Sequence, residues 1–297
     1  MNPAALIADD RESGLVASQS TEKARKVLPE ELTQGFRRVG LQEGRALMLH
    51  ASLHTLGSVE GGAAMVLHRL LGVIGKQGTL MMPTFTYVTT HGNYHENEKG
   101  DYTKPGCWCE GNENRHIPFI SELQPDKRIG EIAHRLCSWP ASRRSRHPSY
   151  SFVAVGRNSD ECVREHPFMD PLLPVKKILR FDPYVLLIGV DLDCATAIHL
   201  AEERKTRWKM EKLRALTVTG EGQTWVEVLG IGCSKGFAKI RSYLPEHAQA
   251  SIGSAHVELH SMKSLVDWAE SLLSKDPMAL ACDDLACLGC RLAARPP

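Results

Sequence analysis

Three histidines and one glutamate offer the side chains that proton transfer needs. His147 lies in the segment RSRHPSYS, His166 follows in the segment EHPFMD, and Glu202 stands three residues after His199. Residues three apart share one face of a helix. A histidine accepts a proton near neutral pH, and a carboxylate beside it fixes its tautomer and raises its basicity. These residue types and spacings predict general-base chemistry.

The nine cysteines are a second source of chemistry. Their odd number and wide spread indicate free thiols in a reducing compartment rather than a disulfide framework. The spacings of Cys107 with Cys109, and of Cys282, Cys287 and Cys290, suit tetrahedral zinc. Alternatively, these cysteines are free and buried, because cysteine packs as a small apolar side chain. Zinc at the last three cysteines would hold the C-terminal tail and take no part in a reaction.

The composition excludes several classes of protein. With 36 Lys and Arg against 35 Asp and Glu, the formal net charge is +1, whereas a surface that coats nucleic acid needs a concentrated basic excess. The most apolar stretch, residues 63–74, is interrupted by His68 and Arg69 and is too short for a membrane helix. The amino terminus lacks the pattern of a secretory signal. We therefore expect a cytoplasmic globular protein with neither a nucleic-acid nor a membrane partner.

Apolar segments predict the elements that must position these side chains. A strand at 46–49 leads into a glycine-bearing loop at 52–57, a helix opened by two glycines at 61–62, and a strand at 79–83, which is the order of a βαβ unit. The remaining expected elements are strands at 151–155 and 184–190 and helices at 30–39, 195–204 and 264–273. Open α/β sheets bind ligands at the carboxyl ends of their strands, and Glu202 follows the strand at 184–190.

The domain organisation is simple. Residues 1–26 are polar and without apolar periodicity, which predicts a poorly ordered extension, and residues 27–297 are expected to form one domain. An insert at about 89–118 is polar and aromatic, with five acidic residues against three lysines and arginines. Segments of this length without apolar periodicity are more often functional than connective, so the insert is interpreted as a lid or substrate loop.

Several motifs together resemble a known family. They are LHASL at 49–53, glycines at 57, 61 and 62, VIGKQGTLMMP at 73–83, RSRHPSYSFVAVG at 144–156 and LLIGVDLDCATAIHLAE at 186–202. In this order they resemble the aminoglycoside 3-N-acetyltransferases, also called the antibiotic N-acetyltransferase family, over roughly residues 30–295. The resemblance implies an α/β fold in which helices flank a central, mostly mixed sheet. It also implies acetyl-CoA as the co-substrate and an aminoglycoside amine as the acceptor.

The resemblance also implies roles for individual residues. It makes His166 the general base and Glu202 the carboxylate that orients it, with His147 as the competing histidine and His199 as hydrogen-bonding support. The expected coenzyme-binding residues are Ser52, Leu56, Gly57, Pro83, Thr84 and Ser151. The side chains expected to contact a polycationic acceptor are Asp170, Asp191, Thr196 and Glu203. The implied reaction is direct transfer in a ternary complex, with backbone donors near Ser52 or Thr84 stabilising the oxyanion.

Two alternatives keep the same fold. The acceptor could be another amino sugar or natural-product amine, or the chain could be a non-catalytic, zinc-stabilised binding protein. In either enzymatic interpretation the partner is a small polycationic amine, and the expected assembly is a monomer or a homodimer.

Overall fold

The computed structural model of the chain describes residues 25–91, 116–205, 212–284, 287 and 290. Its centre is a seven-stranded sheet in the order β4-β5-β2-β1-β6-β10-β9. The strands of this sheet are β1 (Ala46–Ala51), β2 (Thr79–Pro83), β4 (Arg143–Arg144), β5 (Phe152–Gly156), β6 (Tyr184–Ile188), β9 (Ala248–Ile252) and β10 (Ala255–Ser261).

The sheet is mixed. Strand β1 pairs in parallel with both β2 and β6, whereas β5, β4, β10 and β9 join antiparallel. The carboxyl ends of β1, β2 and β6 therefore meet at one edge, where the antiparallel β5 begins opposite the end of β2. The expected mixed α/β sheet is confirmed.

Helices cover both faces of this sheet. They are α1 (Pro29–Arg38), α2 (Leu53–Leu56), α3 (Gly62–Ile74), α4 (Glu131–Cys137), α5 (Ser159–Val163), α6 (Leu173–Ile178), α7 (His199–Lys205) and α8 (Met262–Lys275). Single turns of 3-10 helix occur at η1 (Tyr87–Thr89), η2 (Lys127–Ile129), η3 (Leu179–Phe181), η4 (Leu192–Cys194) and η5 (Thr196–Ile198), and a longer one at η6 (Phe237–Tyr243).

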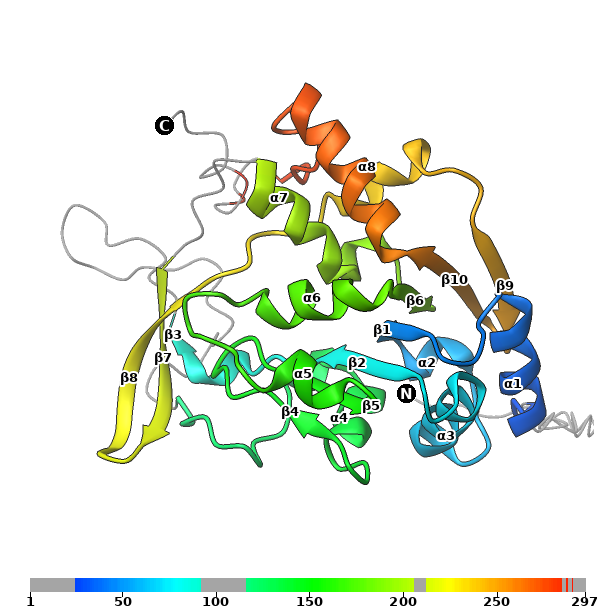
Figure 1. Ribbon diagram of the computed structural model, residues 1–297, viewed down its shortest axis with the longest axis horizontal. Coiled ribbons are helices and arrows are strands. Elements are labelled where there is room, and N and C mark those ends of the chain that lie inside the picture. Colours follow the sequence, from blue (N-terminus) through cyan, green and yellow to red (C-terminus); the bar gives the residue numbers. More distant parts are fainter. Residues whose placement is uncertain (1–24, 92–115, 206–211, 285–286, 288–289, 291–297) are drawn as a thin grey trace, which may run out of the picture.

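The alternation of side chains along the strands creates two cores. Leu47 and Leu49 of β1 join the core formed with α1, α3 and α4, whereas Met48 between them joins the core formed with α6, α7 and α8. Figure 1 shows α6, α7 and α8 on one side of the sheet and α3 and α4 on the other. Successive apolar residues of a strand thus pack against the helices on opposite faces of the sheet.

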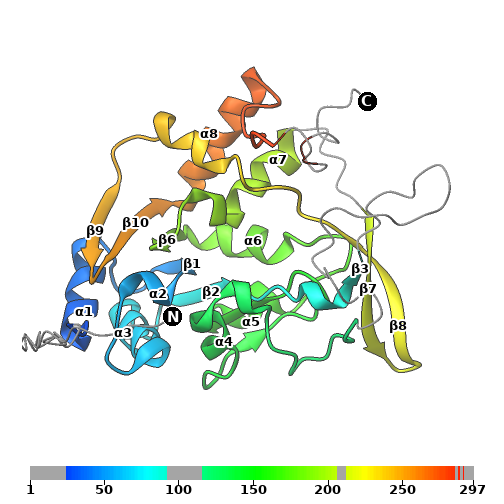
Figure 2. The same ribbon diagram turned by 180° about the vertical axis from the view of Figure 1, so that it is seen from behind.

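A smaller antiparallel sheet stands apart from the central one. It consists of β3 (Thr90–His91), β7 (Lys212–Thr219) and β8 (Gly222–Leu229), in that order. Figure 2 shows the β7–β8 ribbon extending from one end of the molecule. The two strands pair along their whole length and are joined by an exposed turn.

The elements expected from apolar periodicity are confirmed, including the parallel β1-α3-β2 unit. The β7–β8 hairpin and helices α4 to α6 were not expected. The extension at 1–24 and the centre of the insert, 92–115, lie outside the described residues, as do Cys107 and Cys109. No helix within the described ranges is long and apolar enough to span a membrane.

Candidate active site

The carboxyl edge of the parallel strands brings three segments together. Ser52 follows β1, Thr84 follows β2 and Gly189 follows β6. The backbone N–H of Ser52 donates to the carbonyl of Ile188 at 2.9 Å, which ties the first and third segments to each other. Because the strands are parallel and adjacent, the loops that follow them face the same space.

A histidine and a glutamate form a buried pair beside this edge. His199 Nδ1 lies 2.6 Å from Glu202 Oε2, and the two residues are 3% and 1% exposed. Both belong to α7, which follows β6 through η4 and η5, so the i,i+3 spacing alone aligns them. Burial raises the pKa of Glu202, although the hydrogen bond from His199 works in the opposite direction. With an ionised Glu202, His199 donates from Nδ1, so its lone pair is on Nε2.

Packing fixes the ring of His199. The ring of Phe237, the first residue of η6, contacts it edge-on with the ring centroids 4.7 Å apart. Phe237 itself is fully buried. The imidazole therefore has one orientation set by Glu202 and a second constraint set by an aromatic side chain from a distant segment.

His166 is bound differently from the expectation. Its Nε2 donates to the carbonyl of Pro171 at 3.0 Å, and its Nδ1 lies 2.8 Å from the hydroxyl of Ser145. Burial, together with the neighbouring His147, lowers the pKa of His166 to about 2. Glu202 thus orients His199 rather than His166. Both ring nitrogens of His166 contact other groups, so the expected contact between His166 and Glu202 is not present among the described hydrogen bonds, and the role of His166 stays a prediction.

His147 is also committed to its own surroundings. Its Nδ1 accepts hydrogen bonds from the backbone N–H groups of Ser149 and Tyr150 at 3.2 and 3.0 Å. Its Nε2 donates to the carbonyl of Phe168 at 3.2 Å. Burial lowers the pKa of this fully buried residue to about 4. The neutral ring connects the loop before β5 to the segment after α5.

Three of the expected coenzyme-binding residues lie at the end of β2 and the start of β5. Pro83 is buried in the last position of β2. The hydroxyls of Thr84 and Ser151, both with 0% exposure, lie 3.1 Å apart. Arg144 donates to the Ser151 hydroxyl and to the Thr84 carbonyl at 3.1 and 3.0 Å. These side chains brace the edge, since their polar groups bind protein atoms.

The other three expected coenzyme-binding residues lie in the turn after β1. Ser52 is half-buried, Leu56 is fully buried and Gly57 is exposed. Gly57 has a φ of +84°, which favours glycine, and a side chain there would approach the hydroxyl of Ser254. The backbone N–H groups of Ser52 and Thr84, expected near the oxyanion, instead donate to Ile188 and Ser151. The expectation of an oxyanion donor near these residues stays a prediction.

The residues expected to bind the acceptor are dispersed around α6 and α7. Lys176 joins Asp170 and Glu203 through contacts of 2.8 and 2.7 Å. Thr196 is buried in η5. Asp191, half of whose side chain is exposed, accepts from Arg241 at 2.7 Å. Three of these four residues thus lie near α6 and α7. Each of the three carboxylates already has a cationic neighbour.

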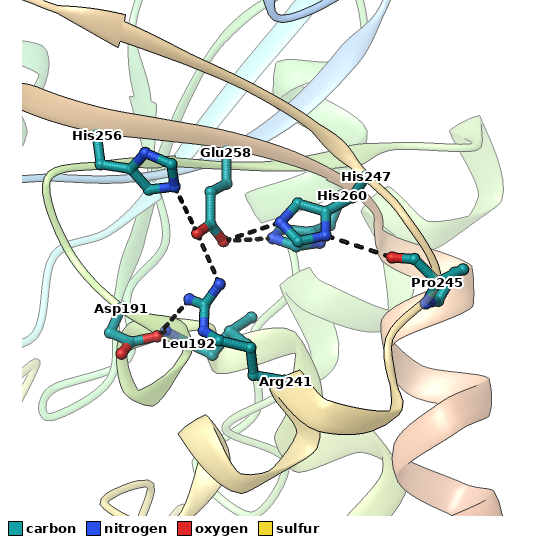
Figure 3. A network of polar contacts seen from close by, with 8 residues as sticks. All are labelled: Asp191, Leu192, Arg241, Pro245, His247, His256, Glu258 and His260. Atoms are coloured by element: carbon teal, nitrogen blue, oxygen red, sulfur yellow. Dashed lines mark hydrogen bonds and ion pairs between the residues drawn. The ribbon is translucent and has the colours of Figure 1, made fainter.

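A hollow of about 460 Å³ opens beside the turn after β1. Thr55, Asp191, Arg241, His256 and Glu258 contribute polar side chains to its lining. Figure 3 shows the network that forms one wall, in which Arg241 bridges Asp191 and Glu258. Burial alone would raise the pKa of Glu258, but hydrogen bonds from His260 and Arg241 outweigh it and hold the pKa at about 2.

His50 is a polar residue for which the sequence assigned no role. It lies on β1 two residues before Ser52 and is 6% exposed. Burial lowers its pKa to about 3, and its Nε2 has no hydrogen-bond partner among the described residues. The sequence signal that could have identified His50 is its position in the strand that leads into the loop with Ser52.

The three cysteines expected to bind zinc lie together, and a fourth joins them. The sulfur atoms of Cys233, Cys282, Cys287 and Cys290 all lie within 4.8 Å of one another. Cys290 Sγ is 3.6 Å from Cys282 Sγ, and the backbone N–H of Cys282 donates to Cys290 Sγ at 3.3 Å. Cys233 comes from the segment between β8 and η6, and its distance along the chain hid it from the spacing analysis.

Comparison with known proteins agrees with this architecture. The profile described as aminoglycoside 3-N-acetyltransferase matches residues 48–274. The SPbeta prophage-derived aminoglycoside N(3')-acetyltransferase-like protein YokD of Bacillus subtilis is 29% identical over 249 residues, covering 81% of this chain and 90% of that protein. The YokD crystal structure superposes with a TM-score of 0.74 at 28% identity, over 84% of this chain and 99% of that one.

Two further solved structures share the fold and contain ligands. One is a histidine-to-alanine variant of AAC(3)-IVa in complex with a gentamicin, with a TM-score of 0.74 at 22% identity over 91% and 97% of the two chains. The other is AAC-IIIb with CoASH, with a TM-score of 0.70 at 21% identity over 84% and 97%. The profile match covers more than half of the sequence, and this chain therefore belongs to the aminoglycoside 3-N-acetyltransferase family of acyltransferases.

Proposed function

We propose that this protein transfers the acetyl group of acetyl-CoA to an amine of an aminoglycoside, at the 3-N position. Its membership of the family supports the reaction class. A neighbour in complex with CoASH and another with a gentamicin support the choice of donor and acceptor. The observation that carries the chemistry is the 2.6 Å contact between His199 and Glu202, buried beside the carboxyl edge of the sheet.

In the proposed step, His199 is the general base and Glu202 orients it. The acceptor arrives as an ammonium ion and transfers a proton to Nε2 of His199, while Nδ1 continues to donate to Glu202. The freed amine nitrogen forms a bond to the thioester carbonyl carbon, and the carbon–sulfur bond breaks. The CoA sulfur leaves with the bonding electrons and takes up a proton, while the amine nitrogen loses its second proton on becoming an amide. No covalent enzyme intermediate is needed.

The proposal gives His166 and His147 a supporting role in place of the base. Each ring uses both nitrogens to hold local backbone or hydroxyl groups. A lowered pKa also makes His166 a poor proton acceptor at neutral pH. His147 and His166 therefore stiffen the loop before β5. The proton is accepted by His199 of α7 instead.

The coenzyme is assigned to the turn between β1 and α3. Ser52 and Gly57 are accessible there, and α3 begins at Gly62 with the first backbone N–H groups of a thirteen-residue helix. Such a start attracts phosphate oxygens because its N–H groups are unsatisfied within the helix. Thr84 and Ser151 fix the neighbouring strand ends, because their buried hydroxyls lie 3.1 Å apart.

The acceptor is assigned to the acidic side chains around the edge. Asp191, half of whose side chain is exposed, lines the hollow beside the turn after β1. Asp170 and Glu203 already hold the ammonium group of Lys176 at 2.8 and 2.7 Å, which is how they would hold an acceptor ammonium. Carboxylates arranged in this way raise the local concentration of a polycation.

A structural zinc ion completes the proposal. Tetrahedral zinc with bonds of about 2.3 Å to four sulfurs places those sulfurs about 3.8 Å apart. The 3.6 Å between Cys282 and Cys290 approaches this value and far exceeds a disulfide bond of about 2.05 Å. Such a centre, with Cys233 as its fourth ligand, would hold the tail against the segment before Phe237. Cys233→Ser should lose the metal, whereas Cys137→Ser, which alters a cysteine in α4 outside the cluster, should keep it.

The reaction is tested by thiol release from acetyl-CoA with gentamicin, apramycin, kanamycin or a simple amino sugar, followed by mass spectrometry. We expect thiol release and a product one acetyl group heavier with an aminoglycoside. Release with the amino sugar alone would move the acceptor to another class of amine. Absence of both release and coenzyme binding would contradict the proposed function and favour a non-catalytic binding protein.

A further inference from the structure

The carboxylate of Glu258 faces a histidine nitrogen that is bound to nothing else. His247 lies in the segment between η6 and β9, and its Nδ1 donates to the carbonyl of Pro245 at 3.3 Å. That bond leaves the lone pair on Nε2 when the ring is neutral. Nε2 is buried, has no hydrogen-bond partner in the described part of the chain, and lies 3.6 Å from Glu258 Oε2. Figure 3 shows both groups pointing toward each other.

Two acceptors in this arrangement repel unless a cation lies between them. The carboxylate of Glu258 is stabilised by Arg241 and His260, but the buried lone pair of His247 that faces it has no compensating donor among the described residues. Either a proton on His247 or a metal ion supplies the missing positive charge. His260 contacts the same oxygen, with Nε2 2.8 Å from Glu258 Oε2, and its ring lies against that of His247 with the centroids 4.3 Å apart. One carboxylate oxygen thus lies close to two imidazole nitrogens.

We propose that His247, Glu258 and His260 bind a zinc ion through Nε2, Oε2 and Nε2. The three ligand atoms lie within 4.8 Å of one another. Tetrahedral zinc with bonds of about 2.0 Å to nitrogen and oxygen separates its ligand atoms by about 3.3 Å. The present separations of 2.8 and 3.6 Å lie on either side of that value. Shifts of a few tenths of an ångström would complete three ligand positions, and a water molecule would take the fourth.

The surroundings suit a metal ligand set. The Nδ1 of His247 donates to a carbonyl, which is the outer contact that commonly fixes a metal-binding imidazole. Arg241 and His256 both bind the other oxygen, Oε1, at 2.7 and 2.9 Å, so Oε2 is left for the metal. Arg241 is itself balanced by Asp191. The local charge before binding is therefore negative by one, counting Arg241 against the two carboxylates.

A second hollow supplies access. It has a volume of about 310 Å³, and both His247 and His260 line it. Glu258 lines the 460 Å³ hollow on the other side, beside the turn after β1. The three ligands thus form a partition between two solvent-accessible spaces. Alternation along β10 produces this placement, because residues 256, 258 and 260 share one face of the strand.

The proposed ion would attach the segment between η6 and β9 to β10. Without it, His247 contacts β10 through its ring packing on His260, with the centroids 4.3 Å apart, and through Nε2, which lies 3.6 Å from Glu258 Oε2. With it, the segment gains a bond to a strand in the central sheet. This site is separate from the cysteine cluster and requires neither that cluster nor the proposed acyl transfer.

The test measures zinc bound by the full chain after dialysis against a chelator and titration with zinc chloride. The wild type should bind about two zinc ions per chain, one at the cysteines and one here. His247→Gln, which preserves a donor for the Pro245 carbonyl, should bind about one and should weaken the lost site at least a hundredfold. His256→Gln is the matched control, because His256 binds Oε1 of the same carboxylate and is half exposed. It should retain both ions.

X-ray absorption separates this proposal from that of the cysteine centre. The Cys233→Ser protein should retain one zinc ion with nitrogen and oxygen neighbours, and the His247→Gln protein one with sulfur neighbours. If the cysteine proposal alone fails, the wild type binds a single ion that His247→Gln abolishes. Equal zinc binding by wild type and His247→Gln would overturn the present proposal. So would NMR evidence that His247 is doubly protonated at neutral pH and unchanged by added zinc.

Discussion

Two pairs of buried side chains near the carboxyl edge of the sheet use histidine in opposite ways. In the pair His147 and His166, the ring nitrogens bind backbone groups and one serine hydroxyl. In the pair His199 and Glu202, the imidazole binds a carboxylate at 2.6 Å. Both pairs are more than nine-tenths buried. The two pairs thus differ in the partner of the ring and not in burial.

Electrostatics explains the difference. A buried imidazole among neutral groups loses hydration when it becomes charged, so the pKa values of His147 and His166 fall to about 4 and about 2. A carboxylate in direct contact compensates an imidazolium. The first pair is therefore a neutral brace, whereas the second places a carboxylate against its imidazole.

The largest expected effect is on kcat after removal of the proposed base. His199→Ala should lower kcat roughly a thousandfold with little change in the KM for acetyl-CoA, because the lost interaction acts in the transition state. Glu202→Gln should lower kcat less, since the imidazole remains. Steady-state kinetics on folded protein provides the measurement. Wild-type turnover by His199→Ala would remove the distinction between the two pairs.

The second prediction concerns the brace. His147→Ala removes the partners of two backbone N–H groups and one carbonyl, so we expect the free energy of unfolding to fall by about 3 kcal/mol. The kcat of the protein that remains folded should stay within about threefold of wild type. Urea unfolding and kinetics on the same preparation separate the two effects. A thousandfold loss of kcat without destabilisation would reverse the roles of the two pairs.

The third prediction is an acid sensitivity that comes from the neutral histidines. His50, His147 and His166 have folded pKa values of about 3, 4 and 2, below an unfolded value near 6.5. Their stability contribution is complete above pH 6.5 and is lost as the pH falls toward the folded values, because the unfolded chain binds more protons. Each contributes at most about 1.4 kcal/mol per pH unit, so the three together approach 4 kcal/mol per unit.

Urea unfolding between pH 7 and pH 5 measures that slope. The raised pKa of Glu202 acts in the opposite direction and offsets part of the loss. His147→Gln should reduce the slope by close to one proton. A slope unchanged in this variant would mean that the ring does not remain neutral in the folded protein.

The smallest expected effect is at the surface contact between α6 and α7. Lys176 joins α6 to α7 through Asp170 and Glu203, and about a third of its side chain is exposed. Lys176→Ala should therefore cost about 1 kcal/mol of stability at low salt and less in concentrated salt. Thermal unfolding at two ionic strengths is the measurement. A large loss of kcat would indicate that this surface contact, and not only the interior of α7, sets the geometry of the His199–Glu202 pair.

Local patterns predicted the parts of the molecule that are local in sequence. The β1-α3-β2 unit follows from apolar runs punctuated by glycines, and the shared helix face of His199 and Glu202 follows from their spacing. Motif resemblance associated Glu202 with His166, whereas the structure places Glu202 against His199, because a resemblance does not report which atoms bind each other. Both nitrogens of His166 are used by groups that only the folded chain brings near.

Contacts between distant segments were beyond sequence reasoning. Cys233 joins the three terminal cysteines across η6, the β9–β10 pair and α8. Glu258 contacts Arg241, which also contacts Asp191, and it lies close to His247 from the segment before β9. Single-sequence periodicity identifies a strand and its faces, but it does not identify the element that will pack against each face.

The position of both proposed catalytic side chains within one turn of α7 has an evolutionary consequence. Their mutual distance depends on helix geometry and on Phe237, whereas the acidic groups around the edge come from separate segments. Selection can therefore alter the surrounding loops, and with them the range of amines accepted, without rebuilding the chemical step. Under the proposed function, the groups that transfer the proton and the groups that select the amine therefore lie on different segments and can change independently.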